Sequence, residues 1–205
     1  MKKRIFAIGL IAMAMMLSTS VARAQDATAE EKEKALKYLE QTRKGVEEAT
    51  KGLSPAQWNF KPGPDRWSVA EVMEHIAAAE DLLRDGLIVN QVMKQPAAPG
   101  RDVAKIDDAI KTQITDRSQK AKAPEPLLPT NRFGSPDGSL KHFEESRTKT
   151  EDYLKSTAGL RAHAMDSPTG QKLDGYDWII FIAAHSERHT KQILEVRADP
   201  NFPKS

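Results

Sequence analysis

Residues 177–196, which read DWIIFIAAHSERHTKQILEV, carry the most regular apolar pattern in the chain. At about 100° per residue, the interior-facing side chains fall within one stripe roughly 80° wide. The stripe consists of Trp178, Ile182, His185, His189, Ile193 and Val196. The pattern therefore predicts a helix with His185 and His189 one turn apart, both pointing into the interior of the protein.

Two interior imidazoles at this spacing suggest a metal site. An i, i+4 pair of neutral imidazoles can reach one ion, and zinc, nickel, copper and iron all accept such ligands. The alternative is a pair of core histidines bonded to backbone or side-chain acceptors. The protease motif HExxH does not fit because Ser186 follows the first histidine, and HxxEH does not fit because Arg188 precedes the second. Glu187 lies roughly 160° round the helix, so it faces solvent and cannot be the base for a water held by the pair.

The chain begins with the pattern of a secretory signal peptide over residues 1–24. Basic residues at 2–4, an apolar region over residues 5–17 and an A-x-A sequence at residues 22–24 follow in order. The apolar region is short for a membrane span, which needs about 20 residues. Cleavage before Gln25 would leave residues 25–205 as a single domain, periplasmic or secreted and free of the membrane. The alternative is an uncleaved membrane anchor.

The amino-acid composition argues against several classes of function and of metal ligand. The sequence has 31 basic and 29 acidic residues, and loss of residues 1–24, with four basic and no acidic residues, would change the net charge from +2 to −2. No basic stripe interleaved with aromatic residues occurs, so nucleic-acid binding has no support. The chain has no cysteine, which excludes disulfides, thiolate ligands and a lipoprotein anchor. A bound metal must therefore have nitrogen and oxygen ligands.

Helical periodicity recurs along the chain without sustained alternation, so we expect an all-α domain. The main helices are predicted over residues 28–52, 68–95, 139–158 and 176–197. Residues 53–67 are predicted to be a loop whose aromatic side chains either plug one end of the bundle or form the rim of a pocket. His142 and His163 are expected to be exposed.

The proline-rich residues 96–138 form a long connection between the second and third helices, with a polar helical piece near residues 103–119. A connection of this length either covers something or carries the chain from one end of the domain to the other. If the connection carries the chain from one end to the other, the second and third helices can run parallel.

The second helix supplies further candidate residues. Ser68 and Glu71 form a capping box at its start. His75 lies one turn after Glu71 at the border of the apolar stripe, and alone it reads as a boundary histidine bonded to Glu71 or water. Glu80 falls inside the stripe and needs a partner, because burial of an unpaired carboxylate is costly. It would either support a metal-bound histidine or lie at a helix end.

The order of these motifs resembles the DinB/YfiT-like family. Trp67 and Ser68 open the second helix, VAEVMEH ends at His75, and after the long connection the last helix carries H-x-x-x-H as His185 and His189. The resemblance covers residues 30–197. It implies a four-helix bundle in which these three histidines hold a divalent transition ion, with zinc or nickel favoured, near one end.

The family is described as metal-dependent enzymes, and characterised relatives include transferases and isomerases that use low-molecular-weight thiols. The signal peptide argues against thiol chemistry here, because reduced thiols are scarce in an oxidising compartment. A three-histidine site leaves coordination positions open, as in catalytic centres. We therefore expect a metal-dependent hydrolase or transferase acting on a small molecule.

Two alternatives remain open: a non-catalytic periplasmic bundle that binds a metal or small ligand, and a plain helical interaction domain. Glu71, Glu80 and Arg188 are further pocket candidates. Arg188 would either meet an anionic substrate group or form a salt bridge at the bundle edge. The sequence leaves the oligomeric state open, with a homodimer among the alternatives.

Overall fold

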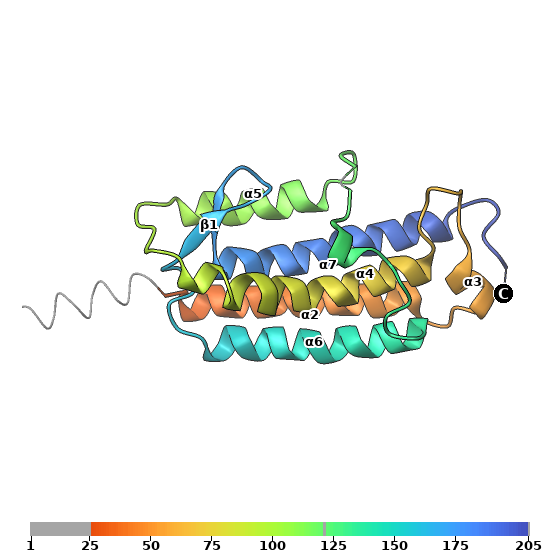
Figure 1. Ribbon diagram of the computed structural model, residues 1–205, viewed down its shortest axis with the longest axis horizontal. Helices are drawn as coiled ribbons and strands as arrows, with labels where there is room; N and C mark the ends of the chain where they lie inside the picture. Colours follow the sequence, from red (N-terminus) through yellow and green to blue (C-terminus); the bar gives the residue numbers. More distant parts are fainter. Residues whose placement is uncertain (1–25, 121, 205) are drawn as a thin grey trace, which may run out of the picture.

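The computed structural model describes residues 26–120 and 122–204. The predicted signal peptide, residues 1–24, lies outside them. Four long helical segments make up the body of the protein, which confirms the prediction of an all-α four-helix bundle (Figure 1). They are α2 (Ala29–Thr50), α4 (Val69–Asp81) continued by the π-helix η1 (Leu82–Val89), α6 (Pro136–Ser156) and α7 (Gly175–Arg197). No helix within the described residues combines the length and the apolar character needed to cross a membrane.

The shorter elements lie in the connections. They are α3 (Pro55–Asn59), the 3₁₀ turns η2 (Val92–Lys94) and η3 (Glu125–Leu127), α5 (Val103–Thr115), and an antiparallel hairpin of β1 (Ala164–Asp166) and β2 (Lys172–Asp174).

The helices do not simply alternate in direction. Figure 1 shows α2 and α7 running one way and α4 and α6 running the opposite way. The chain leaves η1 at one end of the bundle, returns through α5 along the outside, and enters α6 near the end where α4 began. The long connection thus carries the chain from one end to the other, and α4 packs beside α6 in parallel.

Local capping explains where the long helices begin. In three of them the cap side chain accepts the N–H of the third helical residue, and that residue's carboxylate accepts the N–H of the cap. The pairs are Thr28 with Glu31, Ser68 with Glu71, and Asp174 with Asp177. The predicted capping box at Ser68 is therefore present.

Two apolar clusters fill the bundle. The first surrounds Leu39 of α2 and Ile179 of α7, and the second surrounds Val72 of α4 and Ile193 of α7. Trp58 is buried in the second cluster, with Phe60 and Trp67 partly buried against it. These aromatic side chains form the predicted plug.

A buried ion pair crosses the bundle and links all four helical segments. The Arg147 guanidinium of α6 donates to the Glu80 carboxylate at the end of α4, at 2.8 and 3.0 Å. It also donates to the Leu39 carbonyl oxygen and Thr42 hydroxyl of α2 and to the Ser186 hydroxyl of α7. The partner that Glu80 required is thus Arg147.

Three local features differ from the sequence expectations. Residues 53–67 contain the short helix α3, and the stretch between the helices predicted over residues 139–158 and 176–197 contains the β1–β2 hairpin. Strands of three residues are too short for alternation to be recognised. The second helical segment changes from α to π geometry at Leu82, where the buried Arg84 guanidinium reaches the Ser146 carbonyl oxygen on α6.

The two histidines expected to be exposed are instead partly buried. His142 Nε2 lies 2.6 Å from a carboxylate oxygen of Asp81, and its ring stacks on Phe133. His163 Nδ1 lies 2.5 Å from the Gln95 carbonyl oxygen. Both expectations failed because the covering groups come from distant parts of the chain.

Candidate metal centre

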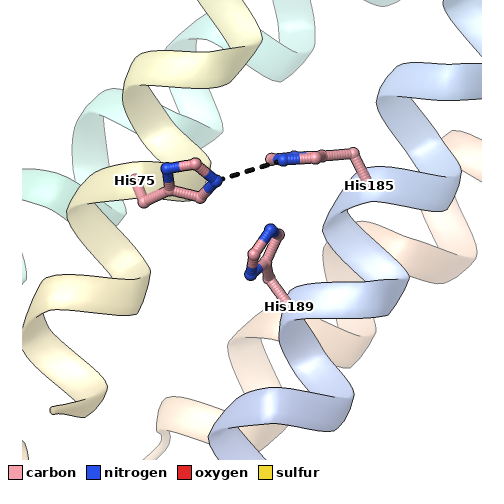
Figure 2. A group of neighbouring side chains, drawn as sticks. All are labelled: His75, His185 and His189. Carbon is pink, nitrogen blue, oxygen red and sulfur yellow. Dashed lines mark hydrogen bonds between the residues drawn. The ribbon is translucent and has the colours of Figure 1, made fainter. Parts of the chain in front are cut away.

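Three imidazoles meet where α4 lies beside α7. His75 comes from α4, and His185 and His189 come from adjacent turns of α7 (Figure 2). The ring centroids are 5.0 Å apart for His75 and His185, 4.5 Å for His75 and His189, and 4.4 Å for His185 and His189. One ring nitrogen from each residue lies within 4.8 Å of the other two. The structure thus brings together all three residues to which the resemblance assigns the metal.

The spacing of the nitrogens suits one small ion. Nε2 of His75 lies 3.2 Å from Nε2 of His185. Two nitrogens bound tetrahedrally at about 2.0–2.1 Å to one zinc ion lie roughly 3.4 Å apart. His75 and His185 therefore need little movement to hold an ion between them.

A backbone carbonyl determines which nitrogen of His75 faces this centre. Nδ1 of His75 lies 2.9 Å from the Leu127 carbonyl oxygen. A carbonyl oxygen only accepts, so Nδ1 carries the hydrogen and Nε2 keeps its lone pair toward the other histidines. His75 is only 3% exposed, and its partner is Leu127 rather than the expected Glu71 or water.

The Gln192 side chain on α7 determines which nitrogen of His189 faces the centre. Nδ1 of His189 lies 2.8 Å from Oε1 of Gln192, and the same oxygen accepts a hydrogen bond from Arg117 at 3.2 Å. Arg117 is further held by two hydrogen bonds to the Glu195 carboxylate. With its Nδ1–H directed to Gln192, His189 also presents Nε2 as the free ligand atom.

His185 gives the centre its more open side. Its exposure is intermediate, whereas His75 and His189 are buried. The Phe181 ring lies nearly parallel to its imidazole at 6.4 Å. His185 is therefore the member of the group that is most accessible to solvent.

Burial keeps the three histidines neutral. Loss of solvent lowers the pKa of His75, and lowers the pKa of His185 further with help from the neighbouring His189 and His75. Burial, reinforced by His75, lowers the pKa of His189 to about 3. Neutral imidazole is the form that binds a metal.

The remaining pocket candidates have other partners. Glu71 accepts the Ser68 N–H at 2.8 Å and pairs with Lys61 at 2.9 Å. Glu80 is 1% exposed. Its carboxylate accepts a hydrogen bond from Arg147, and Arg147 also donates to the hydroxyl of Ser186, which follows His185 in α7.

Arg188 and Glu187 of α7 also point elsewhere. Arg188 donates to the carbonyl oxygens of Ile114, Asp116 and Gln119, so it fastens the segment after α5 instead of forming a salt bridge. Glu187 is directed away from the centre, as predicted, but accepts a hydrogen bond from the Tyr38 hydroxyl at 2.7 Å rather than facing only solvent.

Sequence reasoning missed the groups that orient the histidines. Gln192 could have been found, because position i+3 on a helix lies next to His189. The Leu127 carbonyl could not have been found, since a backbone group has no signature of its own.

The chain is similar to known proteins both in sequence and in fold. The uncharacterized protein YuaE of Bacillus subtilis (strain 168) is 28% identical over 151 residues, which span 72% of this chain and 87% of YuaE. YfiT from Bacillus subtilis, described as a probable metal-dependent hydrolase with an unusual four-helix bundle topology, matches with a TM-score of 0.55 at 16% identity, covering 86% of this chain and 91% of YfiT. At this identity the likeness to YfiT shows a shared fold. The DinB superfamily model matches residues 38–193, a range that includes all three histidines, and the chain therefore belongs to the DinB superfamily.

Proposed function

We propose that the protein binds one divalent transition-metal ion through Nε2 of His75, His185 and His189, and that it is a metal-dependent enzyme of the hydrolase or transferase type. The observation that carries this proposal is the convergence of three neutral imidazoles, two of them already oriented by acceptors at Nδ1. The description of YfiT as a probable metal-dependent hydrolase supports it. Zinc and nickel are the ions that we propose first; copper and iron also accept imidazole ligands, so metal analysis has to decide among them.

The arrangement is that of an open site. When bound, the ion supplies a Lewis acid that lowers the pKa of a bound water and polarises a substrate carbonyl. Three protein ligands leave coordination positions for water and substrate. His185, of intermediate exposure, leaves the approach to these positions partly open, and the Trp67 ring packs beside His75 with the ring centroids 5.0 Å apart.

A specific observation favours the alternative, a non-catalytic bundle that captures a metal or a small ligand. The polar candidates for a base or an anion-binding group, Glu71, Glu80 and Arg188, are all engaged in structural contacts. An enzyme at this site would then depend on metal-bound water as its base. The two functions predict the same metal content and differ in turnover.

We further propose that residues 1–24 are removed and that the protein works in the periplasm or is secreted, without a nucleic-acid or membrane partner. The order of the charged, apolar and A-x-A segments supports this. N-terminal sequencing should find Gln25 or a near neighbour as the first residue. Recovery of the intact N-terminus from membranes would contradict it.

Metal analysis followed by turnover tests the main proposal. Protein purified without a nickel column should contain, or take up on titration, one equivalent of zinc or nickel. The loaded protein should then cleave or transfer groups from members of a panel of small esters, amides and phosphoesters, and the His185→Ala variant should not. Stoichiometric metal without turnover across the panel would favour the binding alternative. A failure to take up zinc, nickel, copper or iron would exclude both the enzyme and a bundle that captures a metal.

A further inference from the structure

Glu74 has an unusual set of contacts for a helix residue that precedes a metal ligand. It is 5% exposed, and its carboxylate accepts the backbone N–H groups of Thr130, Asn131 and Arg132 at 2.7, 2.7 and 3.2 Å. It also accepts Nε–H of Arg132 at 3.0 Å. All these donors belong to one loop more than 50 residues away in sequence.

The loop is shaped to receive this carboxylate. Asn131 has a φ of 61°, the left-handed conformation that asparagine tolerates better than most residues. A left-handed residue among right-handed ones turns successive N–H groups toward one point and forms an anion-binding nest. The nest is filled by Glu74 of the same chain.

The other end of the same loop reaches His75. The Arg132 guanidinium donates to the carbonyl oxygens of Pro126 and Leu128, at 2.8 and 2.6 Å, and so closes the loop on itself. The Leu127 side chain packs with Ala78 and Ala79 on α4. Between these fixed points the Leu127 carbonyl oxygen meets Nδ1 of His75.

We propose that residues 125–132 form a clasp that positions His75 for the metal, and that Glu74 and Arg132 are the positioning residues that hold this clasp on α4. The inference rests on the metal site proposed above. It assigns a role to part of the long connection, because the Leu127 carbonyl oxygen orients His75 as a ligand of the proposed metal centre.

The clasp and the metal should stabilise each other. A metal ion on Nε2 withdraws electrons from the ring and makes Nδ1–H a stronger donor to Leu127. The carbonyl in turn makes the ring a better ligand and holds its orientation. Because the two binding events share one imidazole, each must favour the other by the same factor.

Three variants of the purified protein test this with zinc as the probe. Glu74→Gln removes the charge that fills the nest, and Arg132→Met removes the closure of the loop. Glu71→Gln is the matched control, since it neutralises a carboxylate one turn earlier on α4 that does not touch the clasp. We expect zinc affinity, measured by competition with a chromophoric chelator, to fall by about 10–100-fold in the first two variants and to change less than about twofold in the control.

Arg132→Met separates positioning from simple electrostatics. Loss of a positive charge near a cation site should by itself strengthen zinc binding, whereas loss of the clasp should weaken it. Amide hydrogen exchange supplies a second measurement, and its main result comes from the wild-type protein. Zinc should slow exchange of the Thr130, Asn131 and Arg132 amides in the wild-type protein, and Glu74→Gln should abolish that effect.

The outcomes are distinguishable. If the wild type binds neither zinc nor nickel, the proposed function fails, and the clasp inference with it. If the wild type binds zinc but Arg132→Met binds it equally well or better, or if zinc leaves exchange at residues 130–132 unchanged, the clasp is refuted while the metal site stands. Should Glu74→Gln fail to fold, the Arg132→Met affinity and the wild-type exchange decide.

Discussion

Nε2 of His75 and Nε2 of His185 lie 3.2 Å apart although 110 residues separate the two histidines in the chain. They are brought together because α4 and α7 pack side by side. With His189 one turn further along α7, they form a group of nitrogens close enough for one ion.

Replacement of single histidines should divide the five histidines into three groups. His185→Ala and His189→Ala should each remove most of the bound metal, and His75→Ala should weaken binding while leaving a two-histidine site. His142→Ala and His163→Ala should leave the metal stoichiometry unchanged, because their rings bond to Asp81 and to the Gln95 carbonyl oxygen. Elemental analysis and zinc titration of each variant provide the measurement. Full metal occupancy in His185→Ala would refute the site.

Gln192 should matter for metal affinity although it is not a ligand. Gln192→Leu removes the acceptor at Nδ1 of His189 and frees both the tautomer and the ring orientation. Loss of such a partner typically lowers metal affinity by about 10–100-fold. Gln91→Leu is the control, because Gln91 bonds only near its own position at the end of η1. Equal zinc affinity in the two variants would show that Gln192 does not orient His189.

The metal-free protein should lose stability as the pH falls below about 6.5, the ordinary pKa of histidine. Burial lowers the folded-state pKa of His189 to about 3, so between these values the unfolded chain takes up a proton that the folded chain does not. Such a group lowers the free energy of unfolding by about 1.4 kcal/mol per pH unit. Urea unfolding at pH 7.5 and pH 5 should show this loss, and His189→Gln should reduce it. An identical pH dependence in that variant would contradict the prediction.

Acidification should release the metal, and the depressed pKa of His189 should shift that release to a lower pH than ordinary histidines would give. Metal binding requires neutral imidazoles, so protons and zinc compete for Nε2. Bound zinc also opposes protonation, and release should therefore follow the metal concentration as well as pH. Zinc release monitored with a chelating dye should shift to lower pH as total zinc is raised. A release pH that does not respond to zinc would instead indicate loss by unfolding.

The buried ion pair of Glu80 and Arg147 should affect the free energy of unfolding far more than an exposed ion pair does. Arg147→Met would leave the Glu80 carboxylate buried without its partner, which costs about 3–5 kcal/mol. The double variant Glu80→Leu/Arg147→Met should recover much of this loss, because no charge then remains buried. Lys37→Met removes a comparably short but exposed ion pair with Glu33 and should change the free energy of unfolding by at most about 1 kcal/mol. Chemical denaturation of these variants is the test, and an Arg147→Met effect as small as the control would refute it.

The helices and the direction of the α7 pair were determined by the sequence alone. A period of 3.6 residues is a local property, so the apolar stripes of α2, α6 and α7 could be read from spacing. The i, i+4 spacing of His185 and His189 places both imidazoles on the interior side of one helix. The capping box of Ser68 and Glu71 is local for the same reason.

Other features depended on contacts that no local pattern encodes. His75 lay at a stripe border and could be joined to the α7 pair only through a family resemblance, because periodicity does not say which helices become neighbours. Glu80 needed a partner, but the sequence could not choose Arg147 from α6. The three-residue strands of the hairpin were too short to show alternation.

The orientation of His75 was decided by the tertiary structure alone. A histidine in a sequence has two equivalent candidate ligand atoms, and only the acceptor at one nitrogen makes the other the ligand. For His75 that acceptor is the backbone carbonyl of Leu127, held on α4 by a carboxylate and a loop that meet only in the folded chain. The sequence determined that His185 and His189 would face the interior, and long-range packing brought His75 to them and determined which of its nitrogens faces the pair.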